Sequence, residues 1–179
     1  KDLAFKPEPI SKEELAVMKT EMQADVDMIL DAVRVKQKQM PADMTGRAIE
    51  LLRYRETLME IVASLENVQT DLVKIRVHGD YHLGQVLYRA GDFMILDFEG
   101  EPTKDIETRT RKHTALKDVA GMVRSFSYAA YAGLFLFLHN RPEDLEQFLP
   151  WAKACQTWVS VSFLKGYLEA AAGQSFIPK

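Results

Sequence analysis

One stretch decides the fold expected of this chain: Arg76-Val-His-Gly-Asp-Tyr-His-Leu-Gly-Gln-Val-Leu-Tyr-Arg-Ala-Gly-Asp-Phe-Met-Ile-Leu-Asp-Phe-Glu-Gly-Glu-Pro102. A short strand candidate, Ile75–Val77, ends at His78 and Gly79, which places Asp80 in a loop directly after it. Two more strand candidates, 86–88 and 93–96, are joined by Arg89-Ala-Gly-Asp92, whose glycine and aspartate suit a tight hairpin turn. The stretch therefore predicts a small β insertion that carries Asp80.

The sequence before this insertion is helical. Ser11 and Glu14 have the spacing of a capping box, which starts a helix. Apolar residues then recur at steps of three and four, as on one buried helix face. They are Leu15, Met18, Met22, Val26, Ile29 and Val33. Residues 36–46, with Pro41, interrupt the pattern, and a second helix follows with Leu51, Leu58, Ile61, Val62 and Leu65 facing inward. No strand candidate precedes residue 70.

The sequence after the insertion is helical again. A charged loop, Thr103–His113, leads to a long helix over residues 116–139. Pro142 fits the first turn of a last helical region, which Pro150 is expected to kink and Gly173 to end. The expected fold class is therefore α+β, mainly α-helical, with one small hairpin at about residues 86–96.

Composition excludes several classes of protein. The net charge of −3 argues against a nucleic-acid-binding domain, which usually carries a basic surplus. The longest apolar run, Ala129–Leu138, is about half of the roughly 20 residues that span a bilayer, so it predicts a core helix. The single cysteine, Cys155, cannot form an internal disulfide, which favours a reducing, cytoplasmic setting and a small buried side chain at that position.

Oxygen ligands gather around the predicted hairpin. Gln85 stands at its mouth, and Asp97, Glu99 and Glu101 follow its second strand. If that strand stays extended, the three carboxylates point to one face, where they repel unless a divalent cation such as Mg²⁺ binds them. Asp97 emerges from four apolar residues, where an idle charge is costly, which favours a functional role. For Glu101, solvation or pairing with arginines of the next loop is the better interpretation.

The order of these residues resembles that of a known superfamily. A catalytic loop H-x-D-x-x-x-x-N, a hairpin and a D-F-G-like triplet are typical of protein-kinase-like phosphotransferases. Here they read His78, Asp80 and Gln85, then Asp97-Phe98-Glu99, and His82 completes the related H-G-D-x-H loop of aminoglycoside and choline kinases. Gln in place of Asn, DFE in place of DFG, and the stretch 116–130 all look like maltokinase.

The resemblance implies a fold, a reaction and residue roles. Residues 1–179 would form a kinase-like C-terminal lobe, with ATP as donor and the anomeric hydroxyl of maltose as acceptor. Asp80 would orient that hydroxyl and accept its proton, while Gln85 and Asp97, with Glu99 as a third ligand, would hold Mg²⁺ on the phosphates. His78 would fix the loop by hydrogen bonds. His82 would contact either the sugar or the loop backbone, and these two roles stay open.

Other interpretations of single motifs compete with these roles. His78-x-Asp80-x-His82 also has the look of a zinc site, although this spacing on one loop is a weak signal. The basic residues Arg109, Arg111 and Lys112 would neutralise phosphate or belong to a solvated loop. Asp118 and Arg124 are expected to serve helix capping and local pairing.

The nucleotide-binding parts of such a kinase are not recognisable here. No Gly-rich loop or strand lysine precedes residue 70, so the chain is expected to lack the N-terminal lobe and to stop early. In some bacteria the resembling domain is fused to trehalose synthase, which makes such a fusion a possible parent. Two alternatives remain: a non-catalytic kinase-like module that tethers or regulates a fused enzyme, and a kinase for another small hydroxylated acceptor, such as an aminoglycoside or choline.

Overall fold

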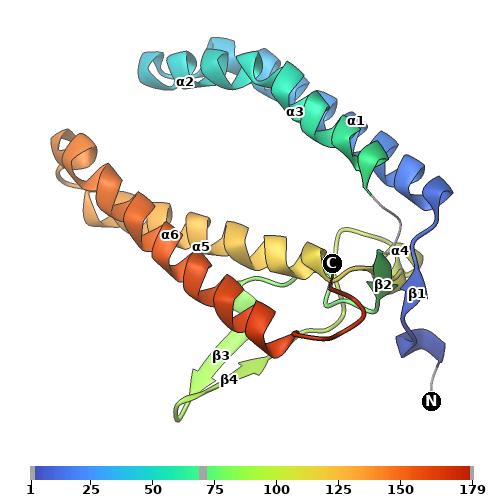
Figure 1. The fold of residues 1–179 in the computed structure, drawn as a ribbon. Coiled ribbons are helices and arrows are strands. Elements are labelled where there is room, and N and C mark those ends of the chain that lie inside the picture. The colour runs from blue at the N-terminus through green and yellow to red at the C-terminus, as the bar shows by residue number, and fades with distance from the viewer. Residues whose placement is uncertain (1–2, 69–71, 178–179) are drawn as a thin grey trace. The chain divides into compact units, whose positions relative to one another are not determined.

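The structure is a computed structural model that describes residues 3–68 and 72–177, except for the side chains of residues 42 and 43. The domain expected over residues 1–179 begins and ends in residues that lie outside the described ones (1–2 and 178–179). The chain falls into two compact units, Pro9–Asp71 and a second that joins Lys1–Glu8 to Leu72–Lys179. Figure 1 shows their helices and strands in chain order.

The unit Pro9–Asp71 is a set of antiparallel helices. Its elements are α1 (Lys12–Lys36), the 3-10 turn Gln37–Gln39, α2 (Ala42–Arg53), α3 (Arg55–Ala63) and the 3-10 turn Ser64–Asn67. The capping box is confirmed, because the Ser11 side chain accepts the Glu14 N–H and the Glu14 carboxylate accepts the Ser11 N–H. The second predicted helix is two helices, α2 and α3, and α2 begins directly after Pro41.

The buried face of this unit differs in detail from the predicted one. Leu15 and Val62 are buried as expected, and Leu30, which was not predicted, is buried with them. Met22 and Ile29 on α1 and Leu51 and Ile61 on the later helices are instead exposed.

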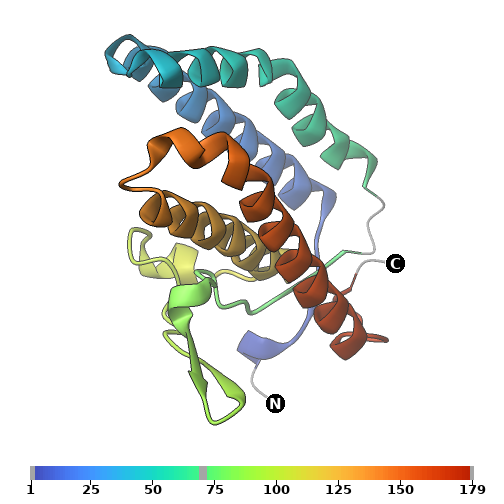
Figure 2. The same cartoon turned by 90° about the vertical axis from the view of Figure 1, so that its left-hand side faces the viewer.

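Two long helices dominate the other unit. Helix α5 (Leu116–Phe137) and helix α6 (Leu145–Ala170) lie side by side in both views (Figures 1 and 2), joined through the 3-10 turn Pro142–Asp144. Leu134 and Leu138 pack with Ala152 at the closed end of the pair, against Tyr131, Leu145, Phe148 and Leu149. Pro150 lies in the early part of α6, and the helix continues past it to Ala170.

Two small sheets complete this unit. Strands β1 (Glu8–Pro9), β2 (Val73–Ile75) and β5 (His113–Thr114) form a sheet in the order β1–β2–β5. Strand β1 was not predicted, because two residues beside a proline carry no strand periodicity. The 3-10 turn Leu3–Phe5 precedes β1, and the short helix α4 (Ile106–Thr110) precedes β5.

The second sheet is an antiparallel hairpin that projects away from the helix pair (Figure 1). Strand β3 (Val86–Arg89) pairs with β4 (Asp92–Ile95), with Val86 opposite Ile95 and Arg89 opposite Asp92. Ala90 and Gly91 form the turn, and both have positive φ (54° and 89°), as a two-residue hairpin turn requires. A 3-10 turn, Leu83–Gln85, leads into β3. The hairpin therefore connects the loop of Asp80 to Asp97.

No helix in the described part of the chain combines the length and the apolar character needed to cross a membrane.

Candidate active site

The loop after β2 is held by one carboxylate from helix α5. The backbone N–H of His78 donates to Oδ2 of Asp118 (2.7 Å), and the N–H of Gly79 donates to Oδ1 of the same residue (2.9 Å). Hydrogen bonds to a charged acceptor are stronger than neutral ones. Gly79 has φ of +89°, which glycine adopts without strain, and this bend carries the chain into Asp80. Asp118 therefore sets the start of the loop.

His78 supports the loop with its whole side chain. The buried ring donates from Nε2 to the carbonyl oxygen of Leu96 (2.7 Å), and its Nδ1 accepts the N–H of Asp80 (3.4 Å). The ring also packs 5.0 Å from the ring of Phe98 and 5.5 Å from that of Tyr81, centre to centre. Both ring nitrogens are thus engaged, so His78 ties the Asp80 loop to the segment after the hairpin.

Helix α5 touches the same loop at two further points. The N–H of Leu83 donates to Oγ of Ser125 (3.0 Å). A Cβ atom built on Gly121 would lie 2.7 Å from the carbonyl oxygen of Tyr81, so only glycine lets the helix come this close. Burial, with the nearby Asp118 charge, raises the pKa of the Tyr81 phenol above its ordinary value. Asp118, Gly121 and Ser125 therefore form one helix face on which the loop rests.

Asp80 opens onto a groove of about 620 Å³ between the loop and this helix face. Its side chain is 33% exposed, so the carboxylate can meet a ligand in the groove. Polar side chains in its lining are those of His82, Glu101, Lys117, Arg124 and Tyr128. Clefts of about 300–1,000 Å³ are the usual size of small-molecule sites.

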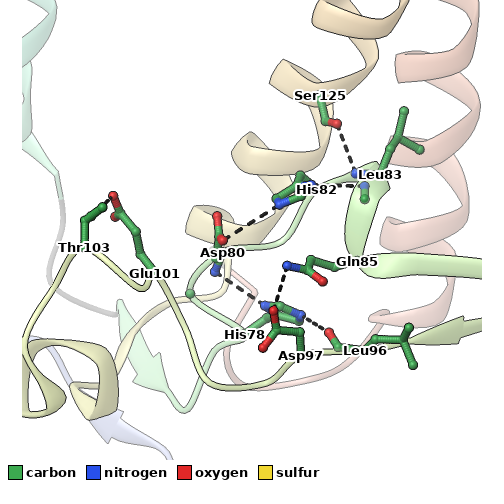
Figure 3. Close-up of polar contacts among 12 residues, drawn as sticks. His78, Asp80, His82, Leu83, Gln85, Leu96, Asp97, Glu101, Thr103 and Ser125 are labelled. Atoms are coloured by element: carbon green, nitrogen blue, oxygen red, sulfur yellow. Dashed lines mark hydrogen bonds and ion pairs between the residues drawn. The ribbon is translucent and has the colours of Figure 1, made fainter.

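His82 lies beside Asp80 in the groove (Figure 3). Its Nδ1 accepts the N–H of Gly84 (3.0 Å), and its Nε2 lies 3.8 Å from Oδ2 of Asp80. Of the two roles left open by the sequence, the contact with the loop backbone is thus present in the structure.

Gln85 and Asp97 meet across the base of the hairpin (Figure 3). The Gln85 amide Nε2 donates to Oδ2 of Asp97 (3.0 Å), and the backbone N–H of Leu96 donates to the Gln85 carbonyl (2.9 Å). Asp97 has φ of +59°, a left-handed conformation that is uncommon outside glycine and is tolerated best by Asn and Asp. This turn ends the strand and directs the carboxylate toward Gln85.

The three-carboxylate cluster expected after the hairpin does not form. Strand β4 ends at Ile95, and Asp97 and Gly100 both have positive φ, so strand alternation does not extend to Glu99 and Glu101. Glu99 is exposed, and among the described residues no group of three or more His, Cys, Asp or Glu side chains is placed to hold a metal ion. His78, Asp80 and His82, the alternative zinc ligands, are likewise not placed as such a group.

The donors that do meet are nevertheless suited to Mg²⁺. Mg²⁺ commonly binds through one or two carboxylates together with substrate phosphates and water, rather than in an all-protein cage. The Asp97 carboxylate and the Gln85 amide meet at a single place, where Nε2 of Gln85 contacts the carboxylate. Turning the amide over would present its neutral oxygen beside the charged one.

Arg109, Arg111 and Lys112 are not among the residues that line the groove. Lys112 is 12% exposed, and its ammonium contacts the Glu8 carboxylate and the carbonyl oxygens of Leu3 and Lys6. This hydrogen bond lowers the pKa of Glu8 below its ordinary value. Arg109 packs its side chain over Gly100, and its Nε is buried without a hydrogen-bond partner. Arg111 is exposed.

Sequence reasoning missed the contribution of helix α5. Lys117 and Arg124 line the groove, and Asp118 holds the loop instead of capping its own helix. Glu101 is exposed, as the favoured interpretation of solvation expected, and it also lines the groove and accepts a hydrogen bond from Thr103 Oγ1 (2.7 Å). One signal was available, since Gly121 inside a helix costs about 1 kcal/mol relative to alanine and so indicates a close approach.

Two curated proteins with sequence similarity are glucosamine kinases. One, from Mycolicibacterium smegmatis, is 37% identical over 81 residues, which cover 45% of this chain and 20% of that protein. Another, from Streptacidiphilus jiangxiensis, is 28% identical over 148 residues, covering 71% of this chain and 32% of that protein. The matched part thus spans a third or less of these relatives. No protein-family model matches the chain.

Solved structures of glucosamine kinase have the same fold over almost the whole chain. A complex with glucosamine, ADP and inorganic phosphate superposes with a TM-score of 0.71 at 23% identity, covering 96% of this chain and 38% of the other. A second crystal form gives a TM-score of 0.73 over 97% of this chain and 38% of the other, at 22% identity. The chain therefore has the mainly helical, kinase-like α+β fold of the corresponding part of that enzyme.

Proposed function

We propose that the protein containing this chain is a sugar kinase, and that this chain supplies the groove in which the sugar hydroxyl meets the γ-phosphate of ATP. One observation carries the proposal: Asp80 faces the groove from a loop that Asp118 holds, and the Gln85–Asp97 pair lies at the other end of that loop. In kinases the catalytic base likewise comes first along the chain, and the residues that hold the metal ion follow it.

Asp80 would bind the attacking hydroxyl and take its proton. Transfer of a phosphoryl group depends mainly on positioning and charge neutralisation, because the transition state is loose. A loop fixed by two backbone hydrogen bonds to Asp118 is suited to that task, since the carboxylate of Asp80 needs no rearrangement when the sugar arrives.

Asp97 and Gln85 would hold Mg²⁺, with the remaining positions taken by nucleotide phosphates and water. The bound ion would neutralise charge on the transferred group. Glu99, two residues after Asp97 and exposed like it, stays the third candidate ligand. The residues that cover the nucleotide would come from outside this chain, since the similar solved kinases are much longer. Residues 1–179 alone are therefore expected to show no turnover.

Glucosamine is the first acceptor to consider. The similar proteins are named for it, and the groove has the matching charge, with the carboxylates of Asp80, Glu101 and Asp118 against the cations of Lys117 and Arg124. Glucosamine carries an ammonium group at neutral pH, so a groove with an excess of carboxylate favours it over a neutral sugar. Maltose is the second acceptor, supported by the H-G-D-Y-H-L-G-Q and D-F-E-G-E-P motifs.

An acceptor screen tests the proposal in the full-length protein. Glucosamine, its neutral analogue glucose, maltose, an aminoglycoside and choline would each be offered with ATP and Mg²⁺, and ADP release measured. Turnover of glucosamine well above glucose is expected. Turnover of maltose alone would restore the maltokinase interpretation and with it a link to trehalose synthase. A folded protein that binds ATP and turns over no acceptor would support the non-catalytic, tethering alternative.

A further inference from the structure

The groove contains a second polar group at the position where the acceptor hydroxyl would react. The Nε2 atom of His82 faces Oδ2 of Asp80 across 3.8 Å (Figure 3). That distance is too long for a direct hydrogen bond, whose usual length is about 2.7–3.2 Å. It is short enough for one oxygen atom to contact both groups at hydrogen-bond length.

The loop selects one tautomer of the neutral His82 ring. Nδ1 accepts the backbone N–H of Gly84 (3.0 Å), so the proton of the neutral ring is on Nε2, the atom that faces Asp80. The pair of groups is then complementary around one hydroxyl, because the Asp80 carboxylate accepts its hydrogen while the His82 Nε2–H donates to its oxygen.

The ring is also held in place by its surroundings. A Cβ atom built on Gly84 would lie 2.7 Å from Cε1 and 2.9 Å from Nδ1 of the His82 ring, so any other residue at 84 would push the imidazole out of its place. The next residue, Leu83, is fixed to Ser125 on α5, and the Gln85 N–H donates to the His82 carbonyl (2.9 Å). The ring is thus held by the close approach of Gly84 and by the hydrogen bonds that fix the loop around it.

We infer that His82 and Asp80 together grip the attacking hydroxyl, so that the remaining lone pair of its oxygen points at the phosphate. His82 acts here by orienting the acceptor and takes no proton, which passes from the hydroxyl to Asp80 while the oxygen–phosphorus bond forms and ADP leaves. The inference rests on the proposed function, and it assigns His82 to the reacting oxygen rather than to the rest of the sugar.

Two substitutions separate the two ring nitrogens. His82→Asn keeps an acceptor near Nδ1 for the Gly84 N–H and loses the donor at Nε2, whereas His82→Gln can place an amide N–H near the Nε2 position. In the full-length protein, His82→Asn is expected to lower kcat by about tenfold or more with the KM for ATP and the melting temperature unchanged. His82→Gln is expected to recover part of that loss.

Nuclear magnetic resonance gives a readout that does not depend on turnover. With ¹⁵N-labelled histidine in the full-length protein, the His82 signal, assigned by its loss in His82→Asn, is expected to show the neutral ring protonated on Nε2. A ring protonated on Nδ1 would overturn the inference. Wild-type kcat in His82→Asn would also overturn it. So would equal losses of kcat in both variants together with a lower melting temperature, because His82 would then only support the loop.

The outcomes also separate this inference from the proposed function. A wild-type protein that turns over no acceptor refutes the sugar kinase assignment, and the role of His82 falls with it. A wild-type protein that is active while His82→Asn matches its kcat refutes the role of His82 alone.

Discussion

The Asp80 loop and the Asp97 turn adjoin each other but are held in different ways. Helix α5 side chains bind the backbone N–H groups of His78, Gly79 and Leu83. The segment after the hairpin is exposed from Asp97 to Glu99, and the side chain of Asp97 is held by the Gln85 amide. The helix thus fixes Asp80, the residue proposed to meet the sugar. Asp97, the proposed ion ligand, relies on a left-handed backbone and one hydrogen bond from the Gln85 amide, so a bound ion and its phosphates would complete its placement.

Asp80→Asn is expected to have the largest effect. The substitution keeps the shape of the side chain and removes its ability to accept a proton, so kcat should fall by about 10²- to 10⁴-fold while sugar and ATP binding stay near normal. Steady-state kinetics and nucleotide titration of the full-length protein measure both. If excess Mg²⁺ rescued this variant, the base and the ion ligand would have been assigned the wrong way round.

Asp97→Asn should affect the ion instead. Asparagine tolerates the same left-handed conformation, so the change removes the charge and leaves the turn intact. The Mg²⁺ concentration for half-maximal rate should rise by about tenfold or more, equivalent to ~1.4 kcal/mol. Gln85→Ala should show a milder shift, since water can replace a neutral ligand. An Asp97→Asn variant with an unchanged Mg²⁺ dependence would remove Asp97 from the ion site.

Asp118→Asn tests whether the anchored loop matters for catalysis. One of its two oxygens becomes an N–H₂ group, which faces a backbone N–H donor instead of accepting from it. We expect a loss of about 1–3 kcal/mol in the free energy of unfolding and a fall in kcat. Asp144→Asn, in a partly exposed pair with Arg141 (3.9 Å), is the control and should change neither. A normal kcat in Asp118→Asn would show that the loop keeps its shape without this anchor.

The smallest change is one methyl group on helix α5. In Gly121→Ala the new Cβ would lie 2.7 Å from a backbone oxygen of the Asp80 loop, so the loop or the helix must shift and kcat should fall several-fold. Gly133→Ala is the matched control on the same helix, because its Cβ meets nothing within 4 Å. That variant should gain up to about 1 kcal/mol of stability at unchanged kcat. Equal kinetics in both variants would contradict the close contact between α5 and the loop.

The sequence predicted local features well where a short motif determines them. The capping box at Ser11 and the start of helix α5 at Leu116 both depend on neighbouring residues, and both are present. The hairpin turn at Ala90 and Gly91 is set in the same way by the few residues that need positive φ. Asp80 and Gln85 were assigned to one site because they lie five residues apart in one contiguous motif. No spatial information was needed for that assignment.

The features that the sequence did not reveal depend on distant contacts. Asp118 looked like a helix-capping residue, because nothing near it in sequence shows that its partners are His78 and Gly79. Lys112 looked free to meet phosphate, yet its ammonium is surrounded by Glu8 and two carbonyl oxygens about a hundred residues earlier. The expected alignment of Asp97 with Glu99 failed for a local reason, since one left-handed residue cancels strand alternation.

The Asp118 anchor also sets the order in which the chain can assemble. It joins backbone groups to a side chain 40 residues later, so a long segment must be closed before the two bonds form. Helix α5 consists of local contacts and can form early, whereas the loop of Asp80 acquires its shape only when that helix docks. The His78 and Gly79 amides should therefore exchange with solvent deuterium only through openings that separate α5 from the loop. The protection of these two amides from exchange would measure how often the loop separates from α5, and so what fraction of molecules has the loop in place.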